Sequence, residues 1–256
     1  MQFSLCIDSI YPKENIEEKL TKIKQAGFKF IEFWDWRDKD FNLIMNSGLK
    51  VSNFSGNRIS SLTLDDKEKV IQEVNTSLDV AKKLQCNCIM LLSDILKNDG
   101  SVEISSKSKE EKLLRLYENL KSITEVAEKE QFLLVIEPLN TIKDHKNYFL
   151  DNFQTTLELI QSINSESLKI LYDIYHMQIM EGNILETLQK YHHFIGYIHL
   201  ANVPYRCEPW IGELDYKFIL KELSKVYSGF VGFEFFVKEK SFTYEKLFQW
   251  IQSINF

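Results

Sequence analysis

Short apolar runs alternate along this chain with longer segments in which apolar residues recur at helical spacing. Eight of the runs have the length of buried strands, namely residues 3–7, 29–33, 51–54, 88–92, 132–136, 168–172, 195–200 and 230–236. Helices are predicted between and after them, at residues 14–26, in a short segment ending at 47, and at 65–84, 108–130, 153–163, 179–191, 215–226 and 244–254. This alternation indicates βαβ crossovers and a mainly parallel sheet.

The number of βα units favours a closed barrel. Eight units in 256 residues, without a linker, repeat or low-complexity segment, match one (β/α)8 TIM barrel of about 250 residues. We therefore expect an α/β fold with a single domain over residues 1–256. A doubly wound open sheet is the alternative, but no Gly-x-Gly-x-x-Gly follows the first predicted strand, so the usual dinucleotide signal is missing.

The charge of the chain argues against a nucleic-acid partner. The formal net charge is −6 and the pI is about 5.5, whereas binding to a phosphate backbone requires a basic face. No apolar stretch approaches the roughly 20 residues that span a bilayer, and the first residues lack the pattern of a signal peptide. The four cysteines are too scattered for a disulfide framework, and we interpret Cys86 and Cys88 as core. We expect a cytoplasmic enzyme with no membrane partner; a homo-oligomer is compatible with the sequence.

Arginine is rare in this chain. Among the 31 basic residues only Arg37, Arg58, Arg115 and Arg206 are arginines. A chain that uses lysine for routine surface charge keeps arginine for places that need a planar, forked donor. Three of the four lie in predicted loops or just past strand ends.

Polar side chains occupy the ends of four successive predicted strands. These are Glu137, Asp173, His199 and Glu234, separated by 36, 26 and 35 residues, about one βα unit each. In a barrel all four would point to the carboxyl-terminal mouth, where three uncompensated carboxylates repel one another. A divalent cation removes that cost, and this oxygen-and-nitrogen donor set suits Mg²⁺, Mn²⁺, Co²⁺ or Zn²⁺. Each residue taken alone has another explanation. Asp173 could cap a helix that opens near Met177. The two glutamates could form ion pairs at the rim, and His199 could be a hydrogen-bonded histidine of the core.

Other polar and aromatic residues follow the same strand ends. His176 comes three residues after Asp173, and the segment 202–213 carries Arg206, Glu208 and Glu213. These side chains could position oxygen atoms of a small substrate, although we favour a rim salt bridge for Glu208. Three tryptophans, Trp34, Trp36 and Trp210, could line a pocket or simply pack at the loop mouths.

Five segments resemble one family. They are IEFWDWRDKD (31–40), IEPLN (136–140), YDIYHMQIMEGN (172–183), IHLANVPYRCEPWIGELDY (198–216) and GFVGFEFF (229–236). They resemble the hydroxypyruvate isomerase-like branch of the xylose isomerase-like TIM barrels, a superfamily of sugar isomerases and epimerases. The resemblance implies a (β/α)8 barrel with one divalent metal held by Glu137, Asp173, His199 and Glu234. It also implies that His176, Arg206, Glu32 and Trp34 contact the substrate and that Glu137 and Glu234 transfer protons.

The sequence departs from the family pattern in the loop after the seventh strand. Tyr205, Cys207, Trp210 and Ile211 stand where the family has Gly, His, Gly and Thr, and we expect these bulkier residues to reshape the pocket. At position 199 hydroxypyruvate isomerases tend to have Gln, whereas ketose 3-epimerases have His.

The resemblance implies proton transfer beside a carbonyl, through an enediolate that the metal stabilises as a Lewis acid. One glutamate, Glu137 or Glu234, removes the proton. Return of the proton to the neighbouring carbon isomerises a small hydroxy-carbonyl compound, such as hydroxypyruvate and tartronate semialdehyde. Return to the same carbon from the opposite face gives a ketose 3-epimerase, the alternative reading. A DNA-cleaving AP endonuclease and a non-catalytic metal- or sugar-binding barrel are the other classes considered.

Overall fold

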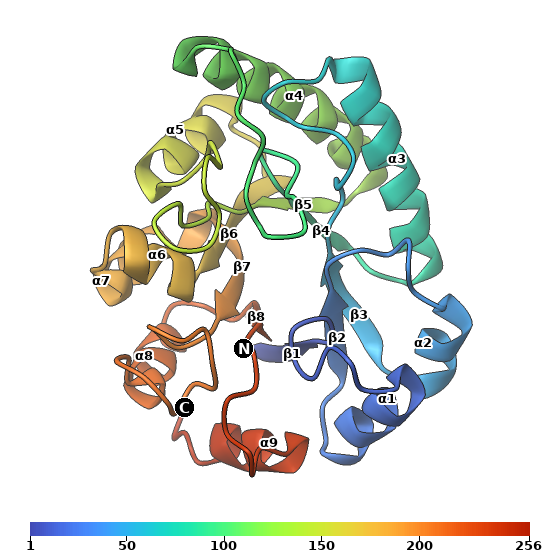
Figure 1. Cartoon of the computed structure of the whole chain (residues 1–256), viewed down its shortest axis with the longest axis vertical. Helices are drawn as coiled ribbons and strands as arrows, with labels where there is room; N and C mark the ends of the chain where they lie inside the picture. Colours follow the sequence, from blue (N-terminus) through green and yellow to red (C-terminus); the bar gives the residue numbers. More distant parts are fainter.

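Eight parallel strands form a ring in the computed structural model, which describes all residues from 1 to 256 (Figure 1). The strands are β1 (Gln2–Cys6), β2 (Phe30–Phe33), β3 (Lys50–Phe54), β4 (Cys88–Leu91), β5 (Leu133–Ile136), β6 (Leu168–Asp173), β7 (Ile195–Leu200) and β8 (Phe230–Phe233). Hydrogen bonds join them in the order β3-β2-β1-β8-β7-β6-β5-β4. The predicted TIM barrel is therefore confirmed.

The ring closes weakly between β3 and β4. These two strands share a single parallel bridge, between Ser55 and Met90, reinforced by a 2.6 Å hydrogen bond from Gly56 N to Met90 O. A Cβ atom at Gly56 would lie 2.7 Å from Ile89 Cδ1, so glycine allows the two strands to approach here. The barrel is nearly closed, and the open edges of β3 and β4 are adjacent.

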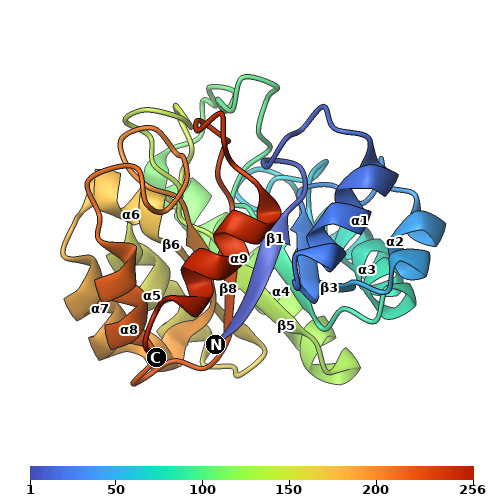
Figure 2. The ribbon, with the colours of Figure 1, turned by 90° about the horizontal axis from the view of Figure 1, so that it is seen from below.

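Helices cover the outside of the ring. They are α1 (Ile16–Gln25), α2 (Phe41–Ser47), α3 (Lys67–Lys83), α4 (Lys109–Glu130), α5 (Phe153–Ile163), α6 (Ile174–Met180), α7 (Ile184–Tyr191), the 3-10 turn η1 (His192–Phe194), α8 (Tyr216–Leu223) and α9 (Tyr244–Gln252). Several begin at the side-chain caps that polar residues provide; Ser108 and Glu111 form a full capping box at the start of α4. Figure 2 shows the loops that follow the strands at one end of the barrel and both chain termini at the other.

Two predicted elements differ from the structure. The helix expected at 179–191 is two helices, because the chain turns at Gly182 and Asn183, both of which have positive φ. The first of them, α6, begins at Ile174 directly after Asp173, five residues before the predicted start at 179. Strand β8 ends at Phe233 rather than at 236, so Glu234 is the first residue beyond it.

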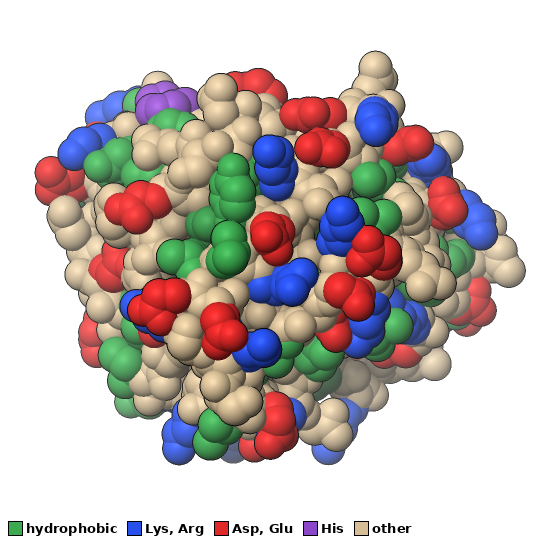
Figure 3. Space-filling model, turned by 90° about the horizontal axis from the view of Figure 1, so that it is seen from above, with side chains coloured by type: hydrophobic (Ala, Val, Ile, Leu, Met, Phe, Trp, Pro, Cys, Tyr) green, Lys and Arg blue, Asp and Glu red, His purple; other side chains and the backbone are tan.

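The outer surface carries mixed charge. On the face over α3, α4 and α5, lysine and arginine side chains are interspersed with aspartate and glutamate (Figure 3). None of the helices has both the length and the apolar composition needed to cross a membrane. The four cysteines are buried thiols, as expected for Cys86 and Cys88.

Candidate active site

Four side chains converge at the carboxyl ends of β5 to β8. Glu137 directly follows β5, Asp173 ends β6, His199 is the penultimate residue of β7, and Glu234 directly follows β8. Each offers one ligand atom, and these atoms all lie within 4.8 Å of one another. Strand register explains the convergence, because Asp173 pairs with His199 in the β6–β7 ladder and His199 pairs with Gly232 in the next. All four residues are buried.

Several atoms of this cluster have no partner within the protein. Glu137 Oε1, Asp173 Oδ2 and His199 Nδ1 are buried and accept or donate no hydrogen bond. His199 Nδ1 lies 3.4 Å from Glu137 Oε1 and 3.3 Å from Glu234 Oε2. Leaving buried polar atoms unpaired is costly, and a cation coordinated between them would remove that cost. The cluster could therefore hold a metal ion, and its oxygen and nitrogen donors fit a hard or borderline divalent cation.

Burial and charge shift the proton affinities of the cluster. Burial, together with the negative charge of Glu137, raises the pKa of Asp173 to about 7. Burial also raises the pKa of Glu137. For His199 burial alone would lower the pKa, but the carboxylates of Glu32 and Glu234 outweigh it and raise the pKa well above the ordinary value. Without a cation this cluster retains protons, which a bound cation would displace.

Asp173 is both a helix cap and a member of the cluster. Its Oδ1 accepts a 2.7 Å hydrogen bond from Tyr175 N at the start of α6, while its Oδ2 faces the cluster. The two explanations for this residue are thus compatible, because a carboxylate has two oxygen atoms.

His176 lies behind Asp173 and does not line the cavity of about 750 Å³ at the barrel mouth. Its Nδ1 is 3.3 Å from Asn140 N and 2.6 Å from Asn140 Nδ2, both donors, so Nδ1 is the acceptor and the ring proton is on Nε2. His176 Nε2 lies 3.4 Å from Asp173 Oδ2. Burial lowers the pKa of His176 well below its ordinary value, which keeps the ring neutral.

Glu32 lies beneath His199 in the barrel interior, and it too does not border the main cavity. Its Oε1 is 3.1 Å from His199 Nε2, and neither atom has another partner. Its Oε2 accepts a hydrogen bond from Tyr197 Oη, which contacts Ser52 Oγ at 2.8 Å. A Cβ at Gly232 would lie 2.4 Å from both Glu32 carboxylate oxygens, so glycine on β8 leaves the space for this side chain.

A cavity of about 750 Å³ opens above the cluster. Among the residues predicted for the site, Glu137, Glu234, Arg206 and Trp34 line it. Glu234 is held from two sides, since Trp34 Nε1 donates to its Oε1 and Arg206 Nη2 lies 2.9 Å from its Oε2. The Arg206 guanidinium also lies over the ring of Tyr175, 5.4 Å from its centroid.

The cavity wall includes residues that the sequence did not single out as site residues. Asp8, Arg58, Lys97, Asp99, Lys143, Asp144 and His145 all line it. His145 Nδ1 contacts Gly100 O at 2.9 Å, and its buried Nε2 has no partner. Asp8 follows the first predicted strand, so the strand-end rule applied to all eight strands would have identified it. The position of His145 depends on the path of the loop after β5, which residue patterns do not reveal.

The loop after β7 differs from expectation in one respect. Glu208, for which we expected a rim salt bridge, is fully buried and accepts hydrogen bonds from the backbone N–H groups of Lys238 and Glu239, at 2.9 Å and 2.8 Å. It joins the loops after β7 and β8 and is not part of a surface ion pair. None of Tyr205, Cys207, Trp210 and Ile211 lines the cavity, although Arg206 of the same loop does.

Only one of the three predicted pocket tryptophans lines the cavity. Trp34 lines the cavity, whereas Trp36 donates to Ser77 Oγ at 3.0 Å and Trp210 donates to Glu239 Oε2 at 2.7 Å, both outside the cavity wall. Trp36 and Trp210 therefore serve packing.

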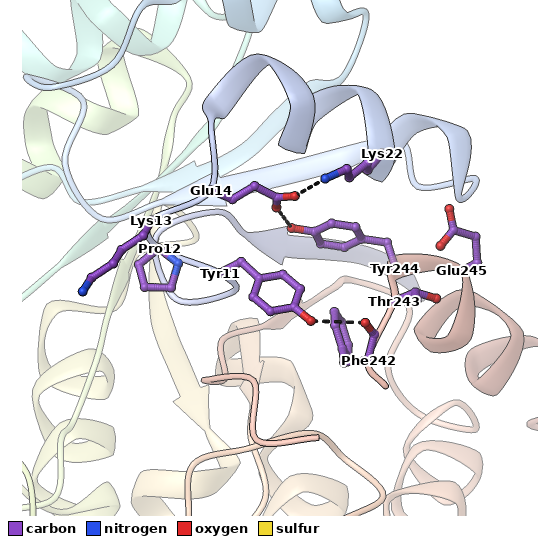
Figure 4. A pocket seen from close by; sticks show the side chains of 9 residues that line it. All are labelled: Tyr11, Pro12, Lys13, Glu14, Lys22, Phe242, Thr243, Tyr244 and Glu245. Carbon is purple, nitrogen blue, oxygen red and sulfur yellow. Dashed lines mark hydrogen bonds and ion pairs between the residues drawn. The ribbon is translucent and has the colours of Figure 1, made fainter. Parts of the chain in front are cut away.

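A second cavity, of about 830 Å³, lies beside the loop after β1 and the start of α9 (Figure 4). Four of its polar side chains are paired: Glu14 pairs with Lys22 at 2.6 Å and accepts from Tyr244 Oη at 2.9 Å, and Tyr11 Oη donates to Phe242 O at 3.2 Å. It is slightly larger than the first cavity but contains no cluster of unpaired ligand atoms, so we place the candidate site at the barrel mouth.

Comparison with known proteins agrees with the geometry. The family model described as "Xylose isomerase-like TIM barrel" matches residues 20–254. The chain belongs to this family.

Relatives in the family are named as isomerases. A putative hydroxypyruvate isomerase of Drosophila melanogaster is 28% identical over 257 residues, covering 94% of this chain and 92% of the relative. The hydroxypyruvate isomerase of Escherichia coli K12 is 27% identical, covering 92% and 93%. A 2-oxo-tetronate isomerase of Cupriavidus necator is 34% identical over 119 residues, covering 46% and 45%. The prediction that the chain is an isomerase is confirmed.

Solved structures share the fold. A protein described as AP endonuclease, family 2, from Brucella melitensis superposes with a TM-score of 0.85 at 21% identity, covering 98% of both chains. A D-psicose 3-epimerase of Clostridium cellulolyticum H10, solved with D-tagatose, has a TM-score of 0.73 at 17% identity, covering 99% and 91%. At these identities the likeness extends to the barrel alone.

Proposed function

We propose that the protein is a metal-dependent isomerase that moves a proton next to the carbonyl of a small hydroxy-carbonyl compound. Hydroxypyruvate and tartronate semialdehyde are the first substrate pair to test, because full-length relatives are named for hydroxypyruvate. The observation that carries the proposal is the buried set of Glu137, Asp173, His199 and Glu234, which has unpaired ligand atoms and of which Glu137 and Glu234 line an open cavity.

The four residues of the set would hold one divalent cation, Mg²⁺, Mn²⁺, Co²⁺ or Zn²⁺. When bound, such a cation supplies Lewis-acid stabilisation of negative charge that develops on the substrate oxygens. Arg206, in the cavity wall, would bind a substrate oxygen and also keeps Glu234 ionised, since its charge with that of His199 outweighs burial and holds the pKa of Glu234 below the usual range.

The two glutamates differ in freedom. Glu234 is fixed by Trp34 and Arg206, whereas Glu137 Oε1 has no hydrogen bond and the side chain lines the cavity. Glu137 is therefore the better group to remove and return a proton, with Glu234 as a fixed ligand. A single base with an unpaired oxygen suits isomerisation, in which one group carries the proton between neighbouring carbons.

The second candidate is a ketose 3-epimerase. Two observations favour it: His199 occupies the cluster, and the cavity of about 750 Å³ has room for a free ketohexose. In that reaction Glu234 would act as the second proton donor from the opposite face of the substrate.

A coupled screen decides between the two. Chelator-stripped protein is reloaded with each of the four cations, and hydroxypyruvate, longer hydroxy-keto acids and free ketohexoses are followed by proton NMR in D2O. We expect metal-dependent isomerisation of at least one hydroxy-carbonyl acid, with deuterium entering beside the carbonyl. Rapid 3-epimerisation of a ketohexose without action on hydroxypyruvate supports the second candidate. Full activity after exhaustive chelation, with no metal detected, refutes the metal site.

A further inference from the structure

One arginine in the cavity wall has an unpaired guanidinium group. Three of the four arginine side chains pair with carboxylates: Arg37 with Glu73 at 2.5 Å, Arg115 with Glu118 at 3.6 Å, and Arg206 with Glu234 at 2.9 Å. The side chain of Arg58 is half-buried, lines the cavity and makes no hydrogen bond or ion pair. Its charge is therefore available to a ligand.

The other cationic side chains of the cavity wall are all engaged: Lys97 pairs with Glu103, Lys143 donates to Pro204 O, and Arg206 pairs with Glu234. Among the carboxylates of the wall, Asp8 pairs with Lys39, Asp99 accepts from Ser101, and Asp144 accepts from Asn140. Arg58 is therefore the only cation of the wall without a partner.

The backbone of Arg58 is held in a fixed position. Glu73, a buried residue of α3, accepts hydrogen bonds from the N–H groups of Arg58 at 2.7 Å, Ile59 at 3.0 Å and Ser60 at 2.7 Å. One buried carboxylate thus anchors the loop after β3 from below. The arginine is presented to the cavity from an ordered loop, which reduces the entropy lost when a ligand binds.

Arg58 lies across the mouth from part of the ligand cluster. In the ring of eight strands, β3 is four strands away from β7, which carries His199, and two strands away from β5, which Glu137 follows (Figure 1). The cavity between them, of about 750 Å³, is in the range that encloses a drug-sized ligand and is larger than a three-carbon hydroxy acid needs. A substrate bound at the cluster would have to be longer to reach Arg58.

We propose that Arg58 forms a second subsite, which binds a carboxylate or phosphate at the end of the substrate far from the reacting carbonyl. The proposal rests on the proposed function and narrows its substrate class to hydroxy-carbonyl chains longer than three carbons with an anionic end. A guanidinium group matches both anions because its planar fork gives two parallel hydrogen bonds.

The test measures a binding preference and needs no turnover. Metal-loaded protein is titrated calorimetrically with sorbitol, sorbitol 6-phosphate and gluconate, which share a chain but differ in the charge at one end. Wild type should bind at least one charged polyol more tightly than sorbitol, and the arm that shows the preference tells phosphate from carboxylate. Arg58→Gln should reduce that preference by about 10- to 100-fold, the size of a charge-assisted hydrogen-bond pair.

The matched control is Arg115→Gln, which removes the same charge from an exposed position on α4 outside the cavity. It should leave the preference unchanged, and circular dichroism checks that each variant is folded. An unchanged preference in Arg58→Gln overturns the subsite, and so does a wild type that binds all three polyols equally. If gluconate bound the metal cluster through its carboxylate, its preference over sorbitol would not change in Arg58→Gln, and this result would overturn the subsite for carboxylates.

A turnover measurement separates this proposal from the one on which it rests. If wild type turns over no hydroxy-carbonyl compound while the Arg58-dependent preference persists, the proposed function fails and the subsite stands. If wild type isomerises such compounds and the ratio of kcat/KM for end-charged and uncharged chains does not depend on Arg58, the subsite fails and the proposed function stands.

Discussion

Two buried aspartates at the barrel mouth lie in different surroundings. Asp94, in the loop after β4, and Asp173, at the end of β6, are both almost fully buried. The oxygens of Asp94 accept hydrogen bonds from Thr63 Oγ1, Ser93 Oγ and Phe149 N. By contrast, Asp173 Oδ2 has no hydrogen-bond partner. The two residues are of the same type and equally buried, but only Asp173 has a carboxylate oxygen free to bind a ligand.

Two glutamates repeat this contrast. Glu73 accepts three backbone hydrogen bonds and pairs with Arg37, so its charge is satisfied by the protein. Glu137 Oε1 is equally buried and unpaired. Glu73 and Asp94, in the half of the mouth built by β1 to β4, fix loops, whereas Glu137 and Asp173, at the ends of β5 and β6, each leave an oxygen atom free. An unsatisfied buried charge, rather than a buried charge as such, marks the reactive side.

The largest effect is expected at Glu137. Glu137→Gln removes the group that we propose to carry the proton, and kcat should fall by about 10²- to 10⁴-fold. Glu73→Gln, the matched substitution in the other half, should lower the melting temperature because it weakens loop hydrogen bonds worth about 1–3 kcal/mol, with kcat largely retained. Steady-state kinetics and thermal unfolding of both variants, with metal content measured alongside, make the test.

The result for Glu137 has a clear counter-outcome. A Glu137→Gln variant that retains its metal and more than about a tenth of wild-type kcat would show that another group moves the proton. A Glu73→Gln variant that is stable but inactive would remove the distinction between the two halves.

The second expected effect concerns the paired aspartates. Asp173→Asn removes a formal charge from the cluster, so the dissociation constant for the cation should rise by more than about 100-fold, beyond what outer partners cost. Asp94→Asn should leave that constant within about threefold and reduce stability instead, by about 1–3 kcal/mol. Calorimetric titration of the metal-free variants with Mn²⁺ measures the two dissociation constants, and thermal unfolding measures the change in stability. Equal losses of Mn²⁺ affinity in the two variants would show that Asp94 and Asp173 do not differ in their role.

A smaller loss of affinity is expected at Glu32. This residue contacts His199 from the side away from the cluster, at 3.1 Å, and a carboxylate in that place orients a ligating imidazole. Glu32→Gln should weaken Mn²⁺ binding by about 10- to 100-fold. If instead affinity for the metal is intact and only KM rises, Glu32 binds substrate as the family resemblance implies, although it does not border the main cavity.

The sequence was sufficient for the barrel and for the cluster because both depend on regular spacing. Strands end about one βα unit apart, so a polar residue at each end predicts convergence without knowledge of the loops. The same rule applied to β1 would have identified Asp8. Residue spacing does not show which buried carboxylates the protein satisfies. The donors to Asp94 include Thr63 and Phe149, which lie 31 and 55 positions away along the chain, whereas Asp173 Oδ2 has no donor.

Loop paths were the part that spacing could not predict. Glu208 reads as a surface acid, yet the loop after β8 folds over it and supplies two N–H donors. His145 enters the cavity because the loop after β5 packs against Gly100. The break between α6 and α7 depends on positive φ at Gly182 and Asn183, which a helical pattern of apolar residues conceals. These features arise from contacts between distant segments, so tertiary structure was needed to see them.

The smallest effect is a pH dependence of stability that the metal should alter. In the metal-free protein the pKa of Asp173 is about 7, above its ordinary value of 3.8, so between these values the folded state binds more protons than the unfolded one. Stability therefore falls as pH rises through this window. The raised pKa of His199 acts in the same direction above its ordinary value of 6.5, because stability from its protonated form is lost as pH rises through the folded pKa.

A bound cation takes the place of these protons, so the gap in melting temperature between metal-loaded and metal-free protein should widen from about pH 5 to about pH 8. At a metal concentration of 100 Kd the cation adds about 2.7 kcal/mol to the free energy of unfolding, which raises the melting temperature by roughly 5–10 °C for a chain of this size.

Asp173→Asn has no carboxyl group at position 173 to titrate, so its metal-free melting temperature should fall less as pH rises, whereas the melting temperature of Asp94→Asn should have the wild-type dependence on pH. Differential scanning fluorimetry across this range gives all the slopes, and a gap that stays constant or narrows with rising pH would show that protons and the cation do not compete for the ends of β5 to β8.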